Sequence, residues 1–176
     1  MKINKDALKA KVNSLAKKLN VSHTTIYNRF FFDAFLTRLS SSQYKDKFIL
    51  KGGLYLSSLL GINNRSTMDI DFCLKKIKME KEEIAKIIKD VISIDINDGI
   101  TFKYIDIDDI RENDIYGGYQ VVIQGKLSNV RHQFGIDVAT GDPIIPKEKG
   151  YEYECLVTKE ILSLKVYSLE SIMLKN

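Results

Sequence analysis

The segment MDIDFCL, residues 68–74, constrains the fold of this chain because its polarity has a period of two. Apolar side chains occupy every second position from Met68 to Leu74, and Asp69 and Asp71 lie between them. Successive side chains of a β-strand point to opposite faces, so the pattern predicts a strand with one apolar and one acidic face. The two carboxylates are therefore expected on the same face, about 7 Å apart along the strand.

Other segments predict the rest of a sheet and the helices that flank it. Period-two or β-branched segments predict strands at residues 100–110, 119–127, 133–140, 153–157 and 161–167. The first three of these are expected to be antiparallel neighbours joined by polar and glycine-containing turns. Helical spacing is expected over residues 54–61, 78–94 and 169–176. The fold class expected is α+β, with a mixed, mostly antiparallel sheet flanked by helices.

The N-terminal segment predicts a pair of helices over residues 4–19 and 23–39. Asn20 suits a helix C-terminus, and Ser22 suits the N-cap of the second helix. Residues 15–30 also resemble a helix-turn-helix DNA reader. The second helix, however, runs into consecutive phenylalanines from position 30, which favour burial on more than one face. We therefore expect residues 1–46 to be a helical segment packed on a core formed by residues 47–176.

Composition narrows the class of protein. The chain has 27 Lys and Arg against 23 Asp and Glu, a net charge of +4, which permits contact with a polyanion without requiring it. Cys73 and Cys155 lie far apart and form no metal-binding or disulfide pattern, so buried free thiols in a reducing compartment are expected. The sequence shows no apolar signal core and no membrane-spanning run, which predicts a cytoplasmic protein without membrane contact.

The pair Asp69 and Asp71 is the first candidate for chemistry. Paired carboxylates on one strand face are costly unless a positive charge lies between them, and a divalent cation with oxygen ligands supplies one. Mg²⁺ is the natural candidate, with Mn²⁺ as an alternative. Cations held in this way activate an attacking hydroxyl and neutralise a leaving pyrophosphate. The competing interpretation is an edge strand whose aspartates simply face water.

Two further features strengthen the catalytic interpretation. Gly52 and Gly53, after Lys51, stand where an apolar run meets a helix, and such glycines let backbone N–H groups approach a phosphate. Asp137 alternates with apolar neighbours on a later strand, so it points away from the core. It is expected to complete a metal shell formed by Asp69, Asp71 and Asp137 and to act as a general base.

These residues resemble a known family. The segment from Phe48 to Phe72 and the later run Ile136 to Asp142 resemble the AbiEii/AbiGii-type nucleotidyltransferase toxins, a branch of the DNA-polymerase-beta-like nucleotidyltransferases. Lys51 to Gly53, Arg65 to Phe72 and the Ile-Asp-Val run follow in the family's order. The resemblance extends over most of the chain and implies the nucleotidyltransferase fold.

The resemblance also implies roles for individual residues. It makes Asp69, Asp71 and Asp137 catalytic metal ligands. The nucleotide-binding residues that it implies are Lys51, Gly52, Gly53, Arg65, Thr67, Arg131 and Lys165. One departure is Leu54, which stands where the superfamily often has a serine or threonine; Ser57 lies one turn further on. The implied substrate is a nucleoside triphosphate, and the implied acceptor is an RNA such as a tRNA 3′ end, or a protein.

The resemblance implies a toxin with a cognate antitoxin, in a toxin–antitoxin or phage-defence pair. Two alternatives remain open at this point: a catalytically degenerate fold that only binds a partner, and a DNA-binding regulator. The family usually continues into a longer helical C-terminal part. A helix is expected to start near residue 168, and the chain ends at residue 176, so either this helix is short or the chain is a truncated product. If the longer C-terminal part is needed, we expect a chain that is inactive or only weakly active.

Overall fold

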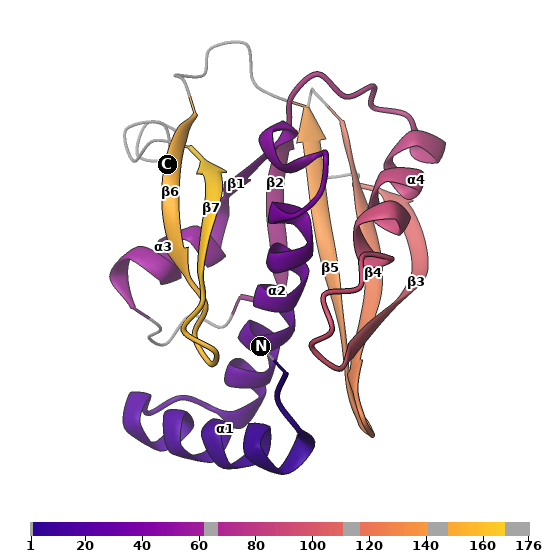
Figure 1. Ribbon diagram of the computed structural model, residues 1–176. Helices are drawn as coiled ribbons and strands as arrows, with labels where there is room; N and C mark the ends of the chain where they lie inside the picture. The colour runs from indigo at the N-terminus through magenta and orange to yellow at the C-terminus, as the bar shows by residue number, and fades with distance from the viewer. Residues whose placement is uncertain (1, 62–66, 111–116, 141–147, 168–176) are drawn as a thin grey trace.

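A seven-stranded mixed sheet organises the structure, which is a computed structural model describing residues 2–61, 67–110, 117–140 and 148–167 (Figure 1). The strand order is β3-β4-β5-β2-β1-β7-β6. The strands are β1 (Phe48–Lys51), β2 (Asp69–Leu74), β3 (Ile100–Asp109), β4 (Gly118–Leu127), β5 (Val130–Thr140), β6 (Lys149–Glu154) and β7 (Ile161–Val166). The pairs β1–β7 and β2–β5 are parallel and the other pairs are antiparallel, so the predicted α+β class with a mostly antiparallel sheet is confirmed.

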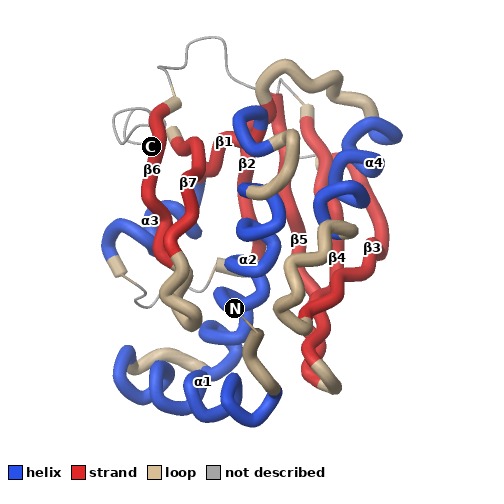
Figure 2. Tube along the Cα trace, viewed as in Figure 1, coloured by secondary structure: helices blue, strands red, loops and turns tan. Residues whose placement is uncertain are grey.

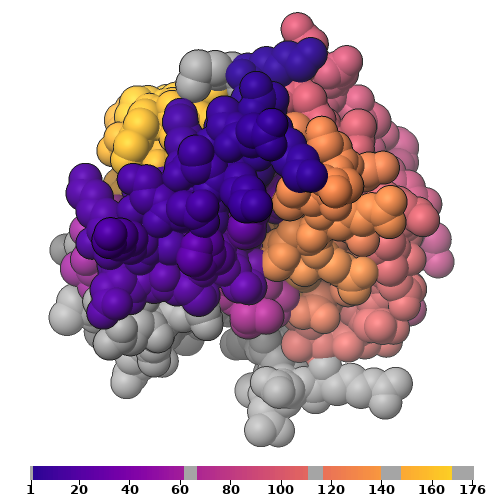
Figure 3. Space-filling model, turned by 90° about the horizontal axis from the view of Figure 1, so that it is seen from below, coloured from indigo at the N-terminus to yellow at the C-terminus, as the bar shows by residue number. Residues whose placement is uncertain are grey.

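Helices cover one face of this sheet (Figures 1 and 2). The helices are α1 (Lys5–Leu19), α2 (His23–Ser40), α3 (Gly52–Leu60) and α4 (Lys81–Ile92), with a short 3₁₀ turn at Lys45–Lys47. Helix α2 runs across the middle of the sheet, α4 lies beside it over β3 and β4, and α1 packs on the first half of α2. Seen from below, α1 and the start of α2 cover this end of the molecule beside β4 and β5 (Figure 3).

The predicted helix caps are present. The Ser22 hydroxyl accepts a hydrogen bond from the backbone N–H of Thr25 at 3.1 Å, and Asn20 ends α1 in the left-handed conformation with φ 55°. Each satisfies backbone groups that the helix itself leaves unpaired.

The phenylalanines of α2 lie inside the core. Phe30, Phe31, Phe32 and Phe35 are all at most 3 % exposed. The rings of Phe32 and Phe35 pack on those of Phe134 and Phe72, which project from β5 and β2 on the face that α2 covers. The prediction that these side chains are buried is confirmed. Because most of α2 is buried in the core, the structure argues against a recognition helix that reads DNA.

Charged side chains on α2 are buried as well. Arg29 forms an ion pair with Asp33 at 3.1 Å, and both contact the Tyr153 hydroxyl of β6. Nearer the end of α2, Arg38 forms a two-pronged ion pair with Asp98, just before β3. These pairs connect α2 to both edges of the sheet, at β6 and at the start of β3.

Some expectations differ from the structure. A strand at 153–157 is wrong in its bounds: β6 ends at Glu154, because a turn that begins at Cys155 connects β6 to β7, with the Lys159 N–H bonded to the Cys155 carbonyl. The helix expected at 169–176 lies outside the described residues. Both cysteines are free and buried, as predicted. Among the described residues, no helix is long and apolar enough to cross a membrane. The boundary at residue 46 stays a prediction.

Candidate active site

The strand β2 presents its two aspartates on the sheet face opposite α2. Asp69 and Asp71 are half-buried, whereas Ile70 and Phe72 between and after them are buried in the core. The alternation arises because one face of β2 packs on α2 and must be apolar, while the other face does not.

The parallel pairing of β2 with β5 brings the third aspartate to this point. Asp71 is the register partner of Asp137, and Asp69 is the partner of Gly135. The Asp69 carboxylate accepts a hydrogen bond from the Gly135 backbone N–H at 3.0 Å. A Cβ at position 135 would lie 2.5 Å from the Asp69 Oδ1 atom, so only glycine leaves room for this carboxylate.

Gln120 on β4 joins the carboxylates. Its side-chain amide donates to Asp137 Oδ1 at 2.8 Å and to Asp69 Oδ2 at 3.4 Å. One nitrogen atom is thus within hydrogen-bond reach of two of the three acids. Sequence reasoning missed Gln120. Its alternation with the buried residues Val121 and Ile123 indicates its face, but only the strand register places it opposite Asp137.

The close approach of the acids perturbs their ionisation. Burial raises the pKa of Asp71 from 3.8 to about 6, and the charge of Asp137 acts in the same direction. Burial also raises the pKa of Asp137, against the hydrogen bond from Gln120. A side-chain hydrogen bond with Asp137 raises the pKa of Asp71 further, and the charge of Asp69 raises the pKa of both carboxyls. The two carboxyls are therefore harder to ionise than isolated aspartates.

The start of α3 lies against the same acids. Lys51 is the register partner of Asp71, and its positive charge lowers the pKa of that carboxyl. Gly52, at φ +76°, would overlap Asp71 Oδ2 if it carried a Cβ, and a Cβ at Gly53 would lie 2.7 Å from Thr67 Oγ1. The first N–H groups of a helix have no partner within the helix and favour an anion. The two glycines therefore allow the first turn of α3, which can bind an anion, to lie close to the carboxylates.

The other sequence-predicted residues are placed differently. Lys165 of β7 is the register partner of Ile49 on β1. Strand β1 lies between β7 and β2, the strand that carries Asp69 and Asp71. Arg131 is not brought to the aspartates: it lies on β5 six residues before Asp137, a separation of about 20 Å in an extended strand. Arg65 lies outside the described residues. Leu54, at the position where the superfamily often has a serine or threonine, is 2 % exposed and packs in the core.

Two of the three carboxylates, rather than all three, are placed to bind a hard cation. No group of three or more His, Cys, Asp or Glu side chains, among those the structure describes, is placed to hold a metal ion. Asp69 is turned toward the β5 backbone and Gln120, which leaves Asp71 and Asp137 as the facing pair. Mg²⁺ is commonly bound by one or two carboxylates together with substrate phosphates. The oxygen donors of this pair match that requirement.

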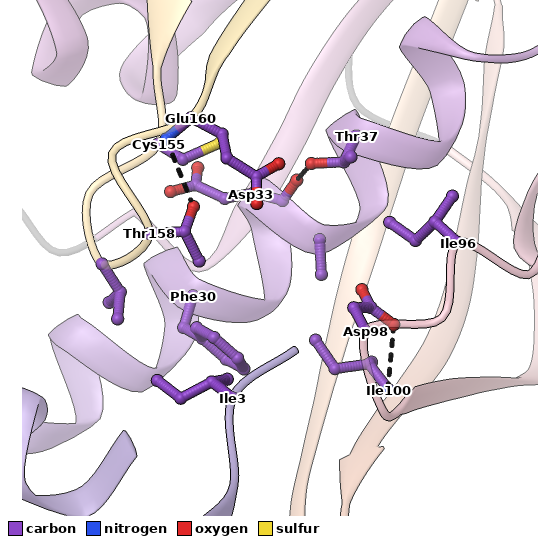
Figure 4. A pocket seen from close by; sticks show the side chains of 12 residues that line it. Ile3, Phe30, Asp33, Thr37, Ile96, Asp98, Ile100, Cys155, Thr158 and Glu160 are labelled. Carbon is purple, nitrogen blue, oxygen red and sulfur yellow. Dashed lines mark hydrogen bonds between the residues drawn. The ribbon is translucent and has the colours of Figure 1, made fainter. Parts of the chain in front are cut away.

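A small hollow lies on the side of the sheet that α2 covers (Figure 4). It has a volume of about 30 Å³ and is lined by α2, the N-terminal segment and the turn after β6, including Asp33, Asp98 and Cys155. Burial raises the pKa of Cys155 to about 12, so its thiol stays protonated. Space of this size suits a water molecule, whereas small-molecule sites occupy several hundred Å³. This hollow is therefore not a candidate nucleotide site.

Facing carboxylates on parallel strands, beside a glycine-initiated helix on a mixed sheet, place the protein in the nucleotidyltransferase class. Within this class, a family model described as "Nucleotidyl transferase AbiEii toxin, Type IV TA system" matches residues 34–175. The chain belongs to the AbiEii family of nucleotidyltransferase toxins.

Two solved structures are similar to this one. JHP933 from Helicobacter pylori is 21 % identical, with a TM-score of 0.48, and the match covers 88 % of this chain and 56 % of that one. A protein from H. pylori provisionally described as a nucleotidyltransferase is 19 % identical, with a TM-score of 0.47, over 88 % of this chain and 58 % of that one. The chain thus spans less than two thirds of the length of either protein. A comparison with curated proteins gave no match.

Proposed function

We propose that this protein is a Mg²⁺-dependent nucleotidyltransferase that moves a nucleoside monophosphate from a nucleoside triphosphate to an RNA acceptor. One observation carries the proposal: Asp71 and Asp137 occupy paired positions of neighbouring strands, with Asp69 held beside them through Gln120. Family membership supports a biological role as a toxin whose activity a cognate antitoxin controls.

The residues around the site have separable tasks in this mechanism. The N–H groups at the start of α3 would donate to phosphate oxygens, and the Lys51 ammonium would neutralise part of their charge. Asp71 and Asp137 would hold the cation, with Asp69 as a third ligand after leaving Gln120. When bound, Mg²⁺ supplies neutralisation of the triphosphate and polarisation of the α-phosphate.

The transfer step balances with the groups at hand. The acceptor hydroxyl oxygen forms a bond to the α-phosphorus, while the bond from this phosphorus to the bridging oxygen breaks and pyrophosphate leaves. Asp137 accepts the hydroxyl proton, consistent with its raised pKa. Positioning and charge neutralisation supply most of the rate enhancement in such reactions.

The proposal is tested by incubating the chain with each α-labelled nucleoside triphosphate, Mg²⁺ or Mn²⁺, and total RNA. We expect label on RNA with the wild type and a loss of at least about a hundredfold in Asp71→Asn and Asp137→Asn, since each removes a proposed cation ligand. Asp6→Asn is the matched control, because it removes an exposed carboxylate from the first turn of α1, away from the strands that carry the three aspartates. Label found on protein and not on RNA would show that the acceptor is a protein. No transfer, together with retained binding of the triphosphate, would favour a degenerate binding protein.

A further inference from the structure

Three cations gather on the site face at the far end of β3, β4 and β5. Lys126 of β4 is the register partner of Arg131 of β5, and Lys103 of β3 lies two residues from Thr101, the partner of Lys126. All three are exposed. Arg131 and Asp137 are an even number of residues apart on a strand of regular register, so their side chains leave the same face.

These cations lack the partners that surface charges usually find. None of Lys103, Lys126 and Arg131 forms an ion pair with a carboxylate of the described residues. Like charges directly opposite one another on neighbouring strands destabilise a sheet. The pair Lys126 and Arg131 therefore costs stability unless an anion lies across it.

The surface between these cations and the aspartates is polar. Gln124 and Gln133 are register partners and fill the next row on this face, followed by Val122 and Gly135. Along β5, the distance from Arg131 to Gly135, the register partner of Asp69, is about 13 Å. A protein partner needs an apolar centre in its interface, and Val122, half-buried, is the one apolar side chain among these residues. A phosphate backbone needs only positive charge and hydrogen-bond donors.

The acidic residues of β3 limit where a polyanion could lie. The register shifts between Tyr104 and Asp106, and beyond this bulge Asp106 and Asp108 face Val122 and Gln120 on the site face. Their charges repel phosphate. A polyanion entering over Lys103 would therefore follow β4 and β5 toward Asp69 rather than continue along β3.

We propose that the strip formed by Lys103, Gln124, Lys126, Arg131 and Gln133 binds the phosphodiester backbone of a single-stranded nucleic acid acceptor, whose terminal hydroxyl reaches the aspartates. This inference rests on the proposed function and gives the acceptor a path. No aromatic side chain lies among these strip residues to stack on bases, so binding depends on backbone charge, tolerates different sequences and weakens with salt.

The test compares two double variants that remove the same charge. Lys126→Gln/Arg131→Gln alters the strip, and Lys9→Gln/Lys11→Gln alters exposed positions of α1. Affinity for a labelled single-stranded RNA is measured by anisotropy over a salt series. We expect the strip variant to bind about tenfold more weakly at low salt and to lose about 1.4 from the slope of log affinity against log salt, because each single-strand phosphate contact contributes about 0.7. The α1 variant should match the wild type.

A kinetic readout separates this inference from the proposed function. The strip variant should raise the KM for RNA and leave the KM for the nucleoside triphosphate unchanged. Equal RNA affinity and equal salt slope in both double variants, or an unchanged KM for RNA, would overturn the strip. Strip-dependent RNA binding without transfer from any nucleoside triphosphate would instead overturn the proposed function and leave the strip standing.

Discussion

Asp71 and Asp137 occupy paired positions of neighbouring strands, where burial and mutual repulsion outweigh the charge of Lys51. The pKa of Asp71 is raised from 3.8 to about 6 in the fold, so folding favours the protonated carboxyl. This contribution to the free energy of unfolding is fully present below pH 3.8 and is lost as the pH rises through about 6. The proposed role in binding a cation needs the ionised carboxylate of Asp71, whereas folding favours the protonated one.

The resulting prediction concerns Asp71→Asn in the absence of divalent cations. The variant should lack the stability loss between pH 3.8 and about 6, so its advantage over the wild type should grow across this range. Urea unfolding in the presence of a chelator, at several pH values, measures this difference. Adding Mg²⁺ at neutral pH should stabilise the wild type and not the variant. Parallel pH profiles for the two proteins would contradict the electrostatic account.

Gly52 and Gly53 place the backbone of α3 against the acids. Gly52→Ala must place a side chain at φ +76° and into Asp71 Oδ2, so it should lose both stability and binding of the Mg²⁺-triphosphate complex. Gly61→Ala is the control, since Gly61 has φ +87° but no atom within 4 Å of the added Cβ. Thermal melts with and without Mg²⁺ and nucleoside triphosphate separate the two effects. Equal ligand-induced stabilisation in both variants would rule out the anion-binding role.

At the scale of elements, α2 is held by buried charge as well as by its phenylalanines. Arg38 donates to both carboxylate oxygens of Asp98 at 2.9 Å and to the carbonyl oxygen of Ile100 at 2.9 Å. The Asp98 carboxylate in turn accepts the backbone N–H of Ile100 at 3.0 Å. The helix is thereby fastened to the loop that starts β3.

Removing Arg38 should expose the cost of that burial. Arg38→Met leaves Asp98 charged and unpaired inside the protein, which should lower the free energy of unfolding by about 3–5 kcal/mol. Chemical denaturation measures the loss. Lys78→Met, which breaks the exposed pair between Lys78 and Glu80, should change stability little. If the Arg38 variant were as stable as the Lys78 variant, the ion pair would have no role in fastening the helix.

At the scale of the whole molecule, the sheet separates stability from chemistry. Helices α2 and α4 cover one face, with α1 packed on α2. Asp69 and Asp71 alternate with the buried Ile70 and Phe72, so they lie on the other face. Leu8 of α1 is fully buried within this helical layer. The two faces should therefore respond independently to substitution.

Leu8→Ala tests this separation. It should cost about 2–5 kcal/mol of unfolding free energy through the cavity it leaves, without changing the affinity of the folded protein for the Mg²⁺-triphosphate complex. Asp137→Asn should show the reverse. Denaturant unfolding and calorimetric titration below the melting transition provide the two measurements. A weakened affinity in the Leu8 variant would mean that the helical layer positions the site.

Local patterns in the sequence were sufficient for the elements and for the character of each face. The period-two alternation around Asp69 and Asp71, the caps Asn20 and Ser22, and the phenylalanines of α2 follow from rules that act over a few residues. The same is true of Gly52 and Gly53, whose need for a close backbone approach is visible where a strand meets a helix.

Register and pairing were decided only by the tertiary structure. The parallel pairing of β2 with β5 sets Asp71 opposite Asp137 and Asp69 opposite Gly135, and the β4–β5 register places Gln120 between the acids. The length of β5 separates Arg131 from Asp137 by about 20 Å, although a few residues divide them in sequence. Such relations depend on which strands pair and in which register, and this choice is made by the packing of the whole apolar face on α2 rather than by any one segment.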